Sequence, residues 1–295
     1  MLLNRVQDVG YDFDAVPKER VETCNLCGSA DFTAIARRDR YGFAATTVAC
    51  TRCGLAFLNP RLTAAAYADF YRGVYRPLVS AYHGRRIDAE TVEADQVPYA
   101  EELAALLEPH LRGRGYRDLL DVGGSTGVVS EAIARRFELA ATVFDPAPAE
   151  VERARARGLD AEVATIETFD PGERRYDVVL LCQTIDHLTD IAAALAQIRT
   201  WLRDGGVFFV DIVDFRWAYA HNGVEQATKI DHPHSLTEPT AEAFLARAGF
   251  DVSQKRRAAD LLHVAYVCRA AQPVPEALPP RETVERLLAE TGAAA

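Results

Sequence analysis

The sequence predicts an α/β fold: a mostly parallel β-sheet with helices on both faces, preceded by a small metal-binding module. From residue 116 onward, short apolar runs alternate with amphipathic stretches, beginning RDLLDV, GVVSEAIARRF, AATVFD and PAEVERARARG. This alternation is typical of parallel strands joined by crossover helices. Two Cys-x-x-Cys pairs lie before residue 61, in a segment with few core-forming residues. They predict a separate unit held together by metal.

The chain divides into four predicted segments. Residues 1–61 form the zinc-binding module, 62–96 a helical linker or cap, 97–270 the main α/β domain and 271–295 a C-terminal tail. In and after the linker, AAAYADFYRGVY and YAEELAALLEPHL repeat apolar residues at spacings of three and four, which predicts helices. The tail is rich in proline and alanine, so we expect part of it to be disordered.

The main domain continues with the run YDVVLLC, which predicts a buried strand, the helix IAAALAQIRTWL and the strand VFFVDIV. A polar and aromatic stretch over residues 214–235 is expected to be irregular. It is followed by a predicted helix, TAEAFLARAGF, and by two closing runs, DVSQKRR and LLHVAYVCRA. The sheet therefore extends to about residue 270.

Composition restricts the classes of partner. Of the 295 residues, 49% are hydrophobic and 26% charged, and no apolar run is as long as a membrane helix. The first twenty residues lack the apolar segment of a secretory signal, so we expect a cytoplasmic protein without a membrane partner. The net charge of -10 disfavours a nucleic-acid partner. We interpret Arg37, Arg38 and Arg40 as a solvated charged turn.

A glycine-rich turn gives the strongest chemical signal in the main domain. In LLDVGGSTG, residues 119–127, an apolar strand runs into a turn that contains Gly123, Gly124 and Gly127 and then into a helix. Glycines let the backbone approach a ligand closely, because they lack Cβ and accept unusual dihedral angles. The next strand ends at Asp145, where a carboxylate can accept hydrogen bonds from both hydroxyls of a ribose. The pattern therefore indicates a ligand with an adenosine group.

Asp121 at the start of the turn helps to separate two ligand classes. A dinucleotide places its pyrophosphate over the helix N-terminus, where another carboxylate would repel it. An amino-acid ligand carries an ammonium group, which a carboxylate attracts. Asp121 therefore favours S-adenosylmethionine over a nicotinamide dinucleotide as the cofactor.

Residues 97–270 resemble the Rossmann-like class I methyltransferases, with DVGGSTG as the first motif and FDP as the second. YDVVLLCQTIDHLTD resembles the family's fourth strand and its following loop, and LRDGGVFFVDI the fifth strand. In place of the acidic residue that often follows the third strand, this chain has Thr165. The resemblance implies that Gly123 and Gly127 approach the methionine part and Asp145 the ribose, while Thr165 and Ile166 lie near adenine and Cys182 and Gln183 line the cofactor.

Four cysteines, Cys24, Cys27, Cys50 and Cys53, lie in the segments CNLCG and CTRCG. Two such knuckles supply four thiolates, which match tetrahedral zinc, and the glycine after each pair permits a tight turn. Because four protein ligands leave no open coordination position, we predict a structural Zn²⁺ in a zinc-ribbon-like module. Iron in a rubredoxin-like site and redox disulfides are the chemical alternatives.

The module, the following CGLAFLNPR and the main domain together resemble sugar C-methyltransferases and their shorter relatives. In that family a Tyr-x-Glu-His segment contributes the base and its neighbours. Here the matching residues are Lys229, Ile230, Asp231 and His232, so the histidine and an acid are kept and the tyrosine is replaced.

His232 is the first candidate for a catalytic base, because histidine titrates near neutral pH. Asp231 is its expected orienting partner and His234 a second candidate. His187 follows the fourth strand, at the edge where α/β sheets present their ligands, and is a third.

We therefore expect a methyltransferase that acts on a small molecule of sugar or natural-product biosynthesis. The alternatives are an RNA methyltransferase that grips its substrate with the zinc module, a non-catalytic regulatory protein that binds S-adenosylmethionine, and a nicotinamide-dependent oxidoreductase.

Overall fold

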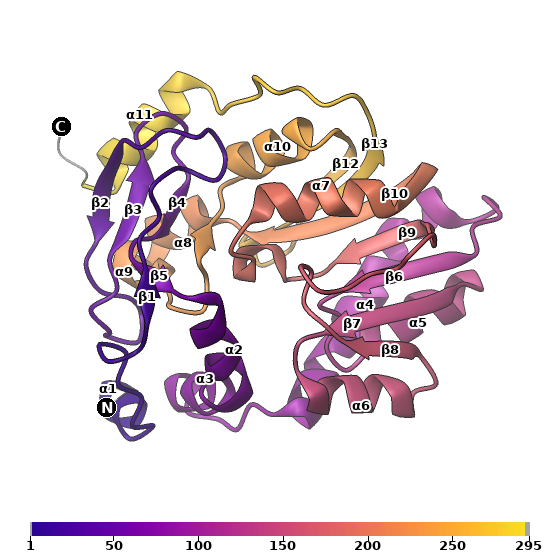
Figure 1. Cartoon of the computed structure of the whole chain (residues 1–295), viewed down its shortest axis with the longest axis horizontal. Coiled ribbons are helices and arrows are strands. Elements are labelled where there is room, and N and C mark those ends of the chain that lie inside the picture. The colour runs from indigo at the N-terminus through magenta and orange to yellow at the C-terminus, as the bar shows by residue number, and fades with distance from the viewer. Residues whose placement is uncertain (1, 293–295) are drawn as a thin grey trace.

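The computed structural model describes residues 2–292 and confirms the α/β prediction (Figure 1). A seven-stranded sheet has the order β12-β13-β10-β9-β6-β7-β8. The strands from β6 to β10 pair in parallel, whereas β13 is antiparallel to both β10 and β12. The seven strands are β6 (Asp118–Val122), β7 (Ala140–Asp145), β8 (Asp160–Val163), β9 (Tyr176–Leu181), β10 (Leu202–Val213), β12 (Phe250–Arg257) and β13 (His263–Ala270).

Helices cover both faces of this sheet because its central strands are apolar on both sides. Neighbouring residues of β6 point to opposite faces: Leu119 packs in the cluster that contains side chains of α4 (Ala89–Leu111) and α5 (Val128–Phe137). Leu120 packs in the cluster that contains side chains of α7 (Ile191–Trp201) and α10 (Glu238–Arg247). Val143 of β7 packs with residues of α6 (Pro148–Ala156). The glycine turn therefore lies at the carboxyl end of a central strand, in a sheet that is packed against helices on both faces.

The N-terminal part forms a second, antiparallel sheet with the order β11-β4-β3-β2. Its strands are β2 (Phe32–Ala36), β3 (Thr47–Cys50), β4 (Ala56–Leu58) and β11 (His234–Ser235). Two further short strands, β1 (Lys18–Glu19) and β5 (Arg61–Leu62), pair with each other. In β11, His234 pairs with Phe57 and Ser235 with Ala56. The N-terminal sheet thus takes its fourth strand from a distant part of the chain.

Three helices form the cap beneath the N-terminal sheet: α1 (Leu2–Gln7), α2 (Ala64–Gly73) and α3 (Tyr75–His83) (Figure 1). The α2 helix begins at Thr63, whose side chain accepts a hydrogen bond from the Ala66 N–H (3.3 Å). Its apolar face is buried at Tyr67 and Phe70, in a cluster that also contains Ile230. The cap therefore packs on the segment that contains the candidate base.

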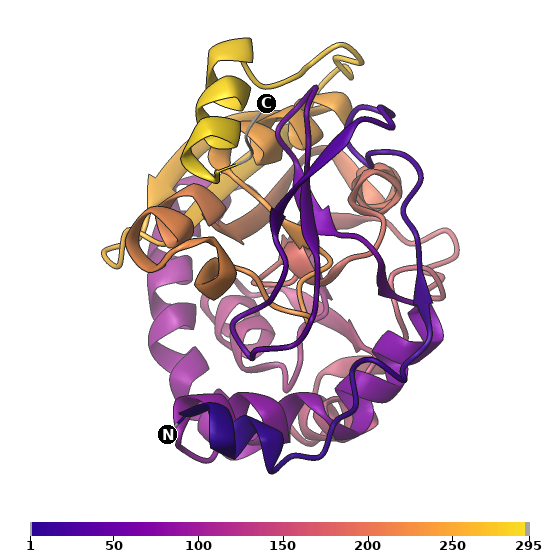
Figure 2. The ribbon, with the colours of Figure 1, turned by 90° about the vertical axis from the view of Figure 1, so that its left-hand side faces the viewer.

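The expectation of an irregular stretch after β10 is wrong, and part of the tail forms a helix. The stretch 214–235 contains α8 (Phe215–Asn222), α9 (Val224–Ala227) and β11, so it is largely regular. The tail forms α11 (Arg281–Glu290), which lies against the N-terminal sheet (Figure 2). Val284 lies next to Gly54: a Cβ added to this glycine would be 3.6 Å from the Val284 side chain. Leu287 packs with Ala49 and Ala56. Apolar packing therefore orders this part of the tail, while residues 293–295 lie outside the described chain.

Within residues 2–292, no helix combines the length and the apolar character needed to cross a membrane.

Candidate functional site

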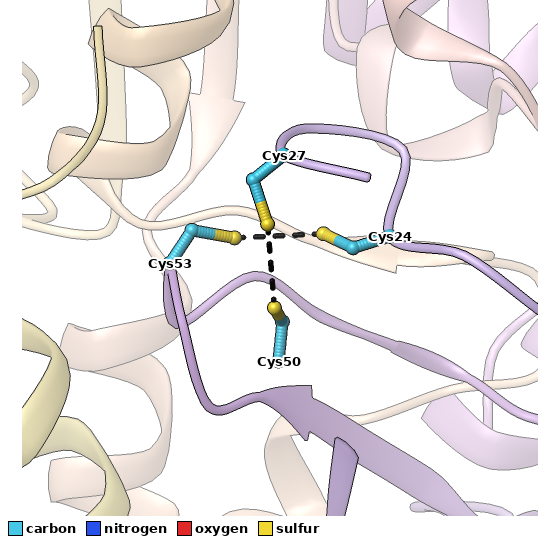
Figure 3. A group of neighbouring side chains, drawn as sticks. All are labelled: Cys24, Cys27, Cys50 and Cys53. Carbon is cyan, nitrogen blue, oxygen red and sulfur yellow. Dashed lines mark hydrogen bonds between the residues drawn. The ribbon is translucent and has the colours of Figure 1, made fainter. Parts of the chain in front are cut away.

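The four cysteines come together at one end of the N-terminal sheet, and their sulfur atoms point toward a common centre (Figure 3). The Cys24 and Cys53 sulfurs are 3.5 Å apart, as are those of Cys27 and Cys50. These distances are far above the roughly 2.05 Å of a disulfide. They are close to the spacing of about 3.8 Å that four thiolates adopt around Zn²⁺ at about 2.3 Å. The four side chains therefore fit a tetrahedral metal ion.

Glycines shape both cysteine knuckles. Gly28 and Gly54 have φ angles of 72° and 73°, in the left-handed region that favours glycine. Their N–H groups donate to the carbonyls of Cys24 and Cys50, at 2.8 Å in each case. Each turn thus brings its two cysteines to one side, as the sequence pattern predicts.

The glycine turn between β6 and α5 leaves no room for larger residues. A Cβ on Gly124 would lie 2.7 Å from Asp121 Oδ2, and one on Gly127 would collide with Leu159 Cδ1. The N–H groups of Gly123 and Gly124 donate to the Phe144 carbonyl, at 2.9 and 3.2 Å. The turn is therefore held tightly against β7, which ends in Asp145.

Asp145 lies beside this turn and is 9% exposed. Its Oδ2 accepts from the Ser125 N–H (3.0 Å) and its Oδ1 from the Ala147 N–H (2.9 Å). Each oxygen keeps a further lone pair, so the carboxylate can still accept two hydroxyl groups. Burial raises the pKa of Asp145 to about 6, while the two backbone N–H groups oppose this shift.

Asp121 is fully buried, and its two oxygens have different surroundings. Oδ2 accepts from the Ser130 hydroxyl at 2.5 Å, whereas Oδ1 has no hydrogen-bond partner within the protein. A buried carboxylate oxygen without a partner is costly, and an ammonium group beside it would remove that cost. Together with the turn and Asp145, Asp121 fits an adenosyl amino acid.

The remaining predicted cofactor residues occupy the same edge of the sheet. Thr165 and Ile166 follow β8, with Ile166 buried and Thr165 half-buried. Cys182 and Gln183 follow β9, and Gln183 has a φ angle of 49°, which is unusual for a residue other than glycine. The Gln183 N–H donates to Asp211 Oδ1 at 2.6 Å, which holds this turn against β10.

The structure brings His187, Asp231 and His232 together, although they come from two segments more than forty residues apart. One potential ligand or proton-accepting atom of each lies within 4.8 Å of the others. The His187 and His232 rings meet edge to face, with centroids 4.5 Å apart. His232 Nε2 is 3.8 Å from Asp231 Oδ2, and His232 Nδ1 is 4.0 Å from Asp186 Oδ2. The His232 imidazole is therefore flanked by two carboxylates.

Hydrogen bonds fix the tautomer of His187. Its Nδ1 is 3.0 Å from the Asp231 carbonyl oxygen and 2.7 Å from the Tyr71 hydroxyl, which itself donates to that carbonyl (2.8 Å). Because a carbonyl oxygen only accepts, an unprotonated Nδ1 at this distance would be repelled. The Nδ1 therefore bears the proton, and Nε2 bears the free lone pair.

Burial keeps both histidines of this cluster neutral. It lowers the pKa of His187 to about 4, against a smaller opposing effect of Asp231. It lowers the pKa of His232 well below 6.5, and the positive charge of Lys229 adds to the effect. Burial raises the pKa of Asp186 to about 7. Neutral imidazoles are the protonation state that a general base requires.

His234 lies apart from this cluster and has a packing role. It belongs to β11, its ring packs near Phe57, and its Nδ1 is 3.0 Å from the Leu188 carbonyl oxygen. Sequence reasoning overlooked Asp186 and gave no specific role to Tyr71. The adjacency of Asp186 to His187, directly after β9, is the signal that could have identified it.

A pocket of about 410 Å³ opens beside the same edge of the sheet. Its wall includes Asp211 and the predicted cofactor residue Gln183, in the turn after β9. It also includes Tyr99 of α4, whose hydroxyl donates to Asp211 Oδ2 (3.0 Å). Apolar side chains such as Phe209 and Leu103 complete the wall.

The chain is similar in sequence to known methyltransferases. A family model described as "Methyltransferase domain" matches residues 92–255. A "Ubiquinone biosynthesis O-methyltransferase" of Paramagnetospirillum magneticum is 35% identical over 116 residues, which are 36% of this chain and 46% of that protein. One of Methylobacterium nodulans is 35% identical over 99 residues, 31% and 39% of the two chains. The chain thus spans less than half the length of these curated relatives.

Solved structures share the fold. The 1,6-didemethyltoxoflavin-N1-methyltransferase of Burkholderia thailandensis, determined with S-adenosylhomocysteine, superposes with a TM-score of 0.53 at 21% identity, covering 74% of this chain and 96% of that one. An S-adenosylmethionine-dependent methyltransferase of Clostridium acetobutylicum gives 0.50 at 14% identity, covering 70% and 99%.

Proposed function

This chain belongs to the methyltransferase-domain family, and from that premise we propose that it is an S-adenosylmethionine-dependent methyltransferase with a small-molecule acceptor. The observation that carries the proposal is that the predicted cofactor residues and the candidate bases lie at the same end of the parallel strands. The glycine turn, Asp145 and the cluster of His187, Asp231 and His232 all lie at or beyond the carboxyl ends of the parallel strands. Ligands of open α/β sheets bind at this edge, so donor and acceptor can meet there.

The cofactor would be held, in this proposal, by residues at the ends of four strands, β6, β7, β8 and β9. S-adenosylmethionine supplies a methyl group on a positively charged sulfur, which an acceptor atom attacks in line. Asp145 would accept the ribose hydroxyls, Asp121 Oδ1 would bind the ammonium group, and the backbone of Gly123 and Gly124 would contact the methionine part. Thr165 and Ile166 would contact adenine, and Cys182 and Gln183 would complete the wall of the site.

His232 removes the proton of the acceptor atom in the proposed mechanism. A proton on His232 gives an imidazolium between Asp231 and Asp186, whose oxygens lie 3.8 and 4.0 Å from its two nitrogens. These carboxylates stabilise the positive charge on both sides. His187, with its free Nε2, is the second basic group at the site.

The acceptor in our proposal belongs to sugar or natural-product biosynthesis. The curated relatives are named for an O-methylation in ubiquinone biosynthesis, so phenols belong in the same test panel as nucleotide sugars. We expect methyl transfer from S-adenosylmethionine to at least one acceptor of such a panel. Binding of the cofactor without turnover of any acceptor would instead favour a regulatory protein, and salt-sensitive binding of structured RNA an RNA methyltransferase.

We also propose a structural Zn²⁺ on Cys24, Cys27, Cys50 and Cys53. The support is the convergence of the four sulfurs, which would occupy all four positions of a tetrahedral thiolate site.

Asp145→Ala should weaken cofactor binding by about 10- to 150-fold, because hydrogen bonds to a charged group contribute roughly 1.5–3 kcal/mol. Isothermal titration with S-adenosylhomocysteine measures the change. Asp204→Ala, at an exposed position beyond α7, is the matched control and should bind normally. Equal affinity of Asp145→Ala and the parent protein would remove Asp145 from the cofactor site.

The pH dependence of kcat/KM should report a base with a depressed pKa. Because the His232 pKa lies well below 6.5, the ring stays neutral as the pH falls through 6.5, so protonation of His232 should cause no loss of activity there. A loss of activity near pH 7 could come from Asp186, whose pKa is raised to about 7. Asp186→Asn separates the two groups: an acidic limb that remains at or above pH 6.5 in this variant contradicts the assignment of His232.

A further inference from the structure

The segment from Thr228 to Pro233, which contains Asp231 and His232, is held at both ends by the N-terminal part of the chain. The Arg40 N–H donates to the Thr228 carbonyl at 3.0 Å. The Leu58 N–H, at the end of β4, donates to the Pro233 carbonyl at 3.0 Å. Residues about 175 to 190 positions apart therefore share main-chain hydrogen bonds around the candidate base.

Asp39 contributes a side chain to this contact. The carboxylate is 2% exposed, and its Oδ2 accepts from the Ile230 N–H at 3.0 Å. Its Oδ1 accepts from the N–H groups of Tyr41 and Phe43, also at 3.0 Å. A buried carboxylate that accepts three N–H groups is a rigid anchor, because charge-assisted hydrogen bonds are stronger than neutral ones. Asp39 therefore joins the turn at residues 39–43 to the peptide between Lys229 and Ile230, one residue before Asp231.

Tyr71 holds the other side of Asp231. Its hydroxyl, on α2, donates to the Asp231 carbonyl at 2.8 Å and lies 2.7 Å from His187 Nδ1. The Tyr71 ring stacks with Tyr67, whose hydroxyl donates to the Ile230 carbonyl at 3.2 Å. The peptide units on both sides of the Asp231 side chain are thus fixed by side chains from the first 71 residues.

His232 has no comparable anchor of its own. Among the described residues, its ring nitrogens make no hydrogen bond, and the carboxylate oxygens of Asp231 and Asp186 lie 3.8 and 4.0 Å from them, which is too long for one. The position of the ring therefore depends on the backbone that carries it and on the packing of His187.

We propose that Asp39 and Tyr71 are positioning residues: by holding the Ile230 N–H and the Asp231 carbonyl they set the location and direction of the His232 imidazole. This inference rests on the proposed role of His232 as base. The turn that contains Asp39 therefore affects catalysis by positioning His232. Neither the Asp39 nor the Tyr71 side chain needs to contact the acceptor.

The first test uses Asp39→Asn and Tyr71→Phe. Asparagine keeps the size of the side chain but replaces one acceptor oxygen with a donor, and phenylalanine removes only the hydroxyl. Each variant should lower kcat by about 10- to 100-fold, because a displacement near 1 Å has effects of this size. The affinity for S-adenosylhomocysteine should stay unchanged. Asp31→Asn, exposed in the same module and without a side-chain contact to the segment, is the matched control and should retain full kcat.

The second test is a double-mutant cycle with His232→Ala. If Asp39 and Tyr71 act through His232, adding either substitution to His232→Ala should cause little further loss of kcat. Full additivity, or unchanged kcat in both single variants, would overturn the inference. If His232→Ala alone leaves kcat intact, the proposed function of His232 fails instead. Tyr71→Phe keeps the ring in its aromatic cluster, so it provides a folded variant even if Asp39→Asn does not fold.

Discussion

Replacing Cys50 with serine should release the metal ion and reduce turnover by a factor of about 100 or more, while the cofactor still binds. Structural zinc sites contribute roughly 10–16 kcal/mol of apparent binding free energy to the folding of small modules, and each thiolate is needed for the closed site. Cys50 ends β3, and β4 follows Cys53 within a few residues. Loss of the site therefore loosens both strands.

Turnover should fall because β4 holds β11, and β11 directly follows His232 and Pro233. The glycine turn and Asp145 belong to the other sheet, so affinity for S-adenosylhomocysteine should change little. Elemental analysis and isothermal titration measure the two effects. Cys268→Ala, a buried cysteine of β13, is the control and should keep about one metal ion per chain. A Cys50→Ser protein with full metal content would disprove the assignment of the tetrad.

Replacing His232 with alanine should lower kcat by about 10²- to 10⁴-fold, which is the usual contribution of a general base. No ring pair or ion pair among the described residues joins His232 to a predicted cofactor residue, so the dissociation constant of S-adenosylhomocysteine should remain that of the parent protein. The substitution also removes the ring that packs against His187, so the circular dichroism spectrum and the melting temperature need to be measured alongside.

His221→Ala is the matched control, because His221 is exposed on α8 and its Nδ1 contacts only the Trp217 carbonyl among the described residues. It should retain full activity. If His187→Ala loses activity and His232→Ala does not, the base is His187, whose Nε2 lone pair is free. Unchanged kcat in both variants would exclude proton removal by this cluster.

Local sequence patterns predicted the parts of the site that consist of one segment. The spacing of Cys24, Cys27, Cys50 and Cys53 is sufficient to predict a convergent tetrad, because each pair forms its own turn. The glycine turn and Asp145 are equally local, since each follows directly from a strand. The alternation of apolar runs predicted the sheet for the same reason.

The contacts across long sequence separations were not predictable in this way. Asp39 lies between Arg38 and Arg40 and reads as part of a charged turn, and only the approach of Ile230, 191 residues later, gives it a role. Tyr71 reads as an aromatic packing residue for the same reason. The helix α11 is a different case, because Val284, Leu287 and Leu288 have helical spacing that the high proline and alanine content of the tail obscured.

The strand β11 also determines how related proteins can be recombined. A chimaera joined near residue 61 would combine the strands β2, β3 and β4 of one protein with the strand β11 of another. The contacting side chains would then come from different proteins and would not be matched to each other. A transplant that preserves the interface must carry residues 228–235 and the helix α11 with the ribbon of β2, β3 and β4, because these segments form its edge strand and its apolar cover. In this protein the unit of exchange is therefore a set of three separate stretches of chain rather than one.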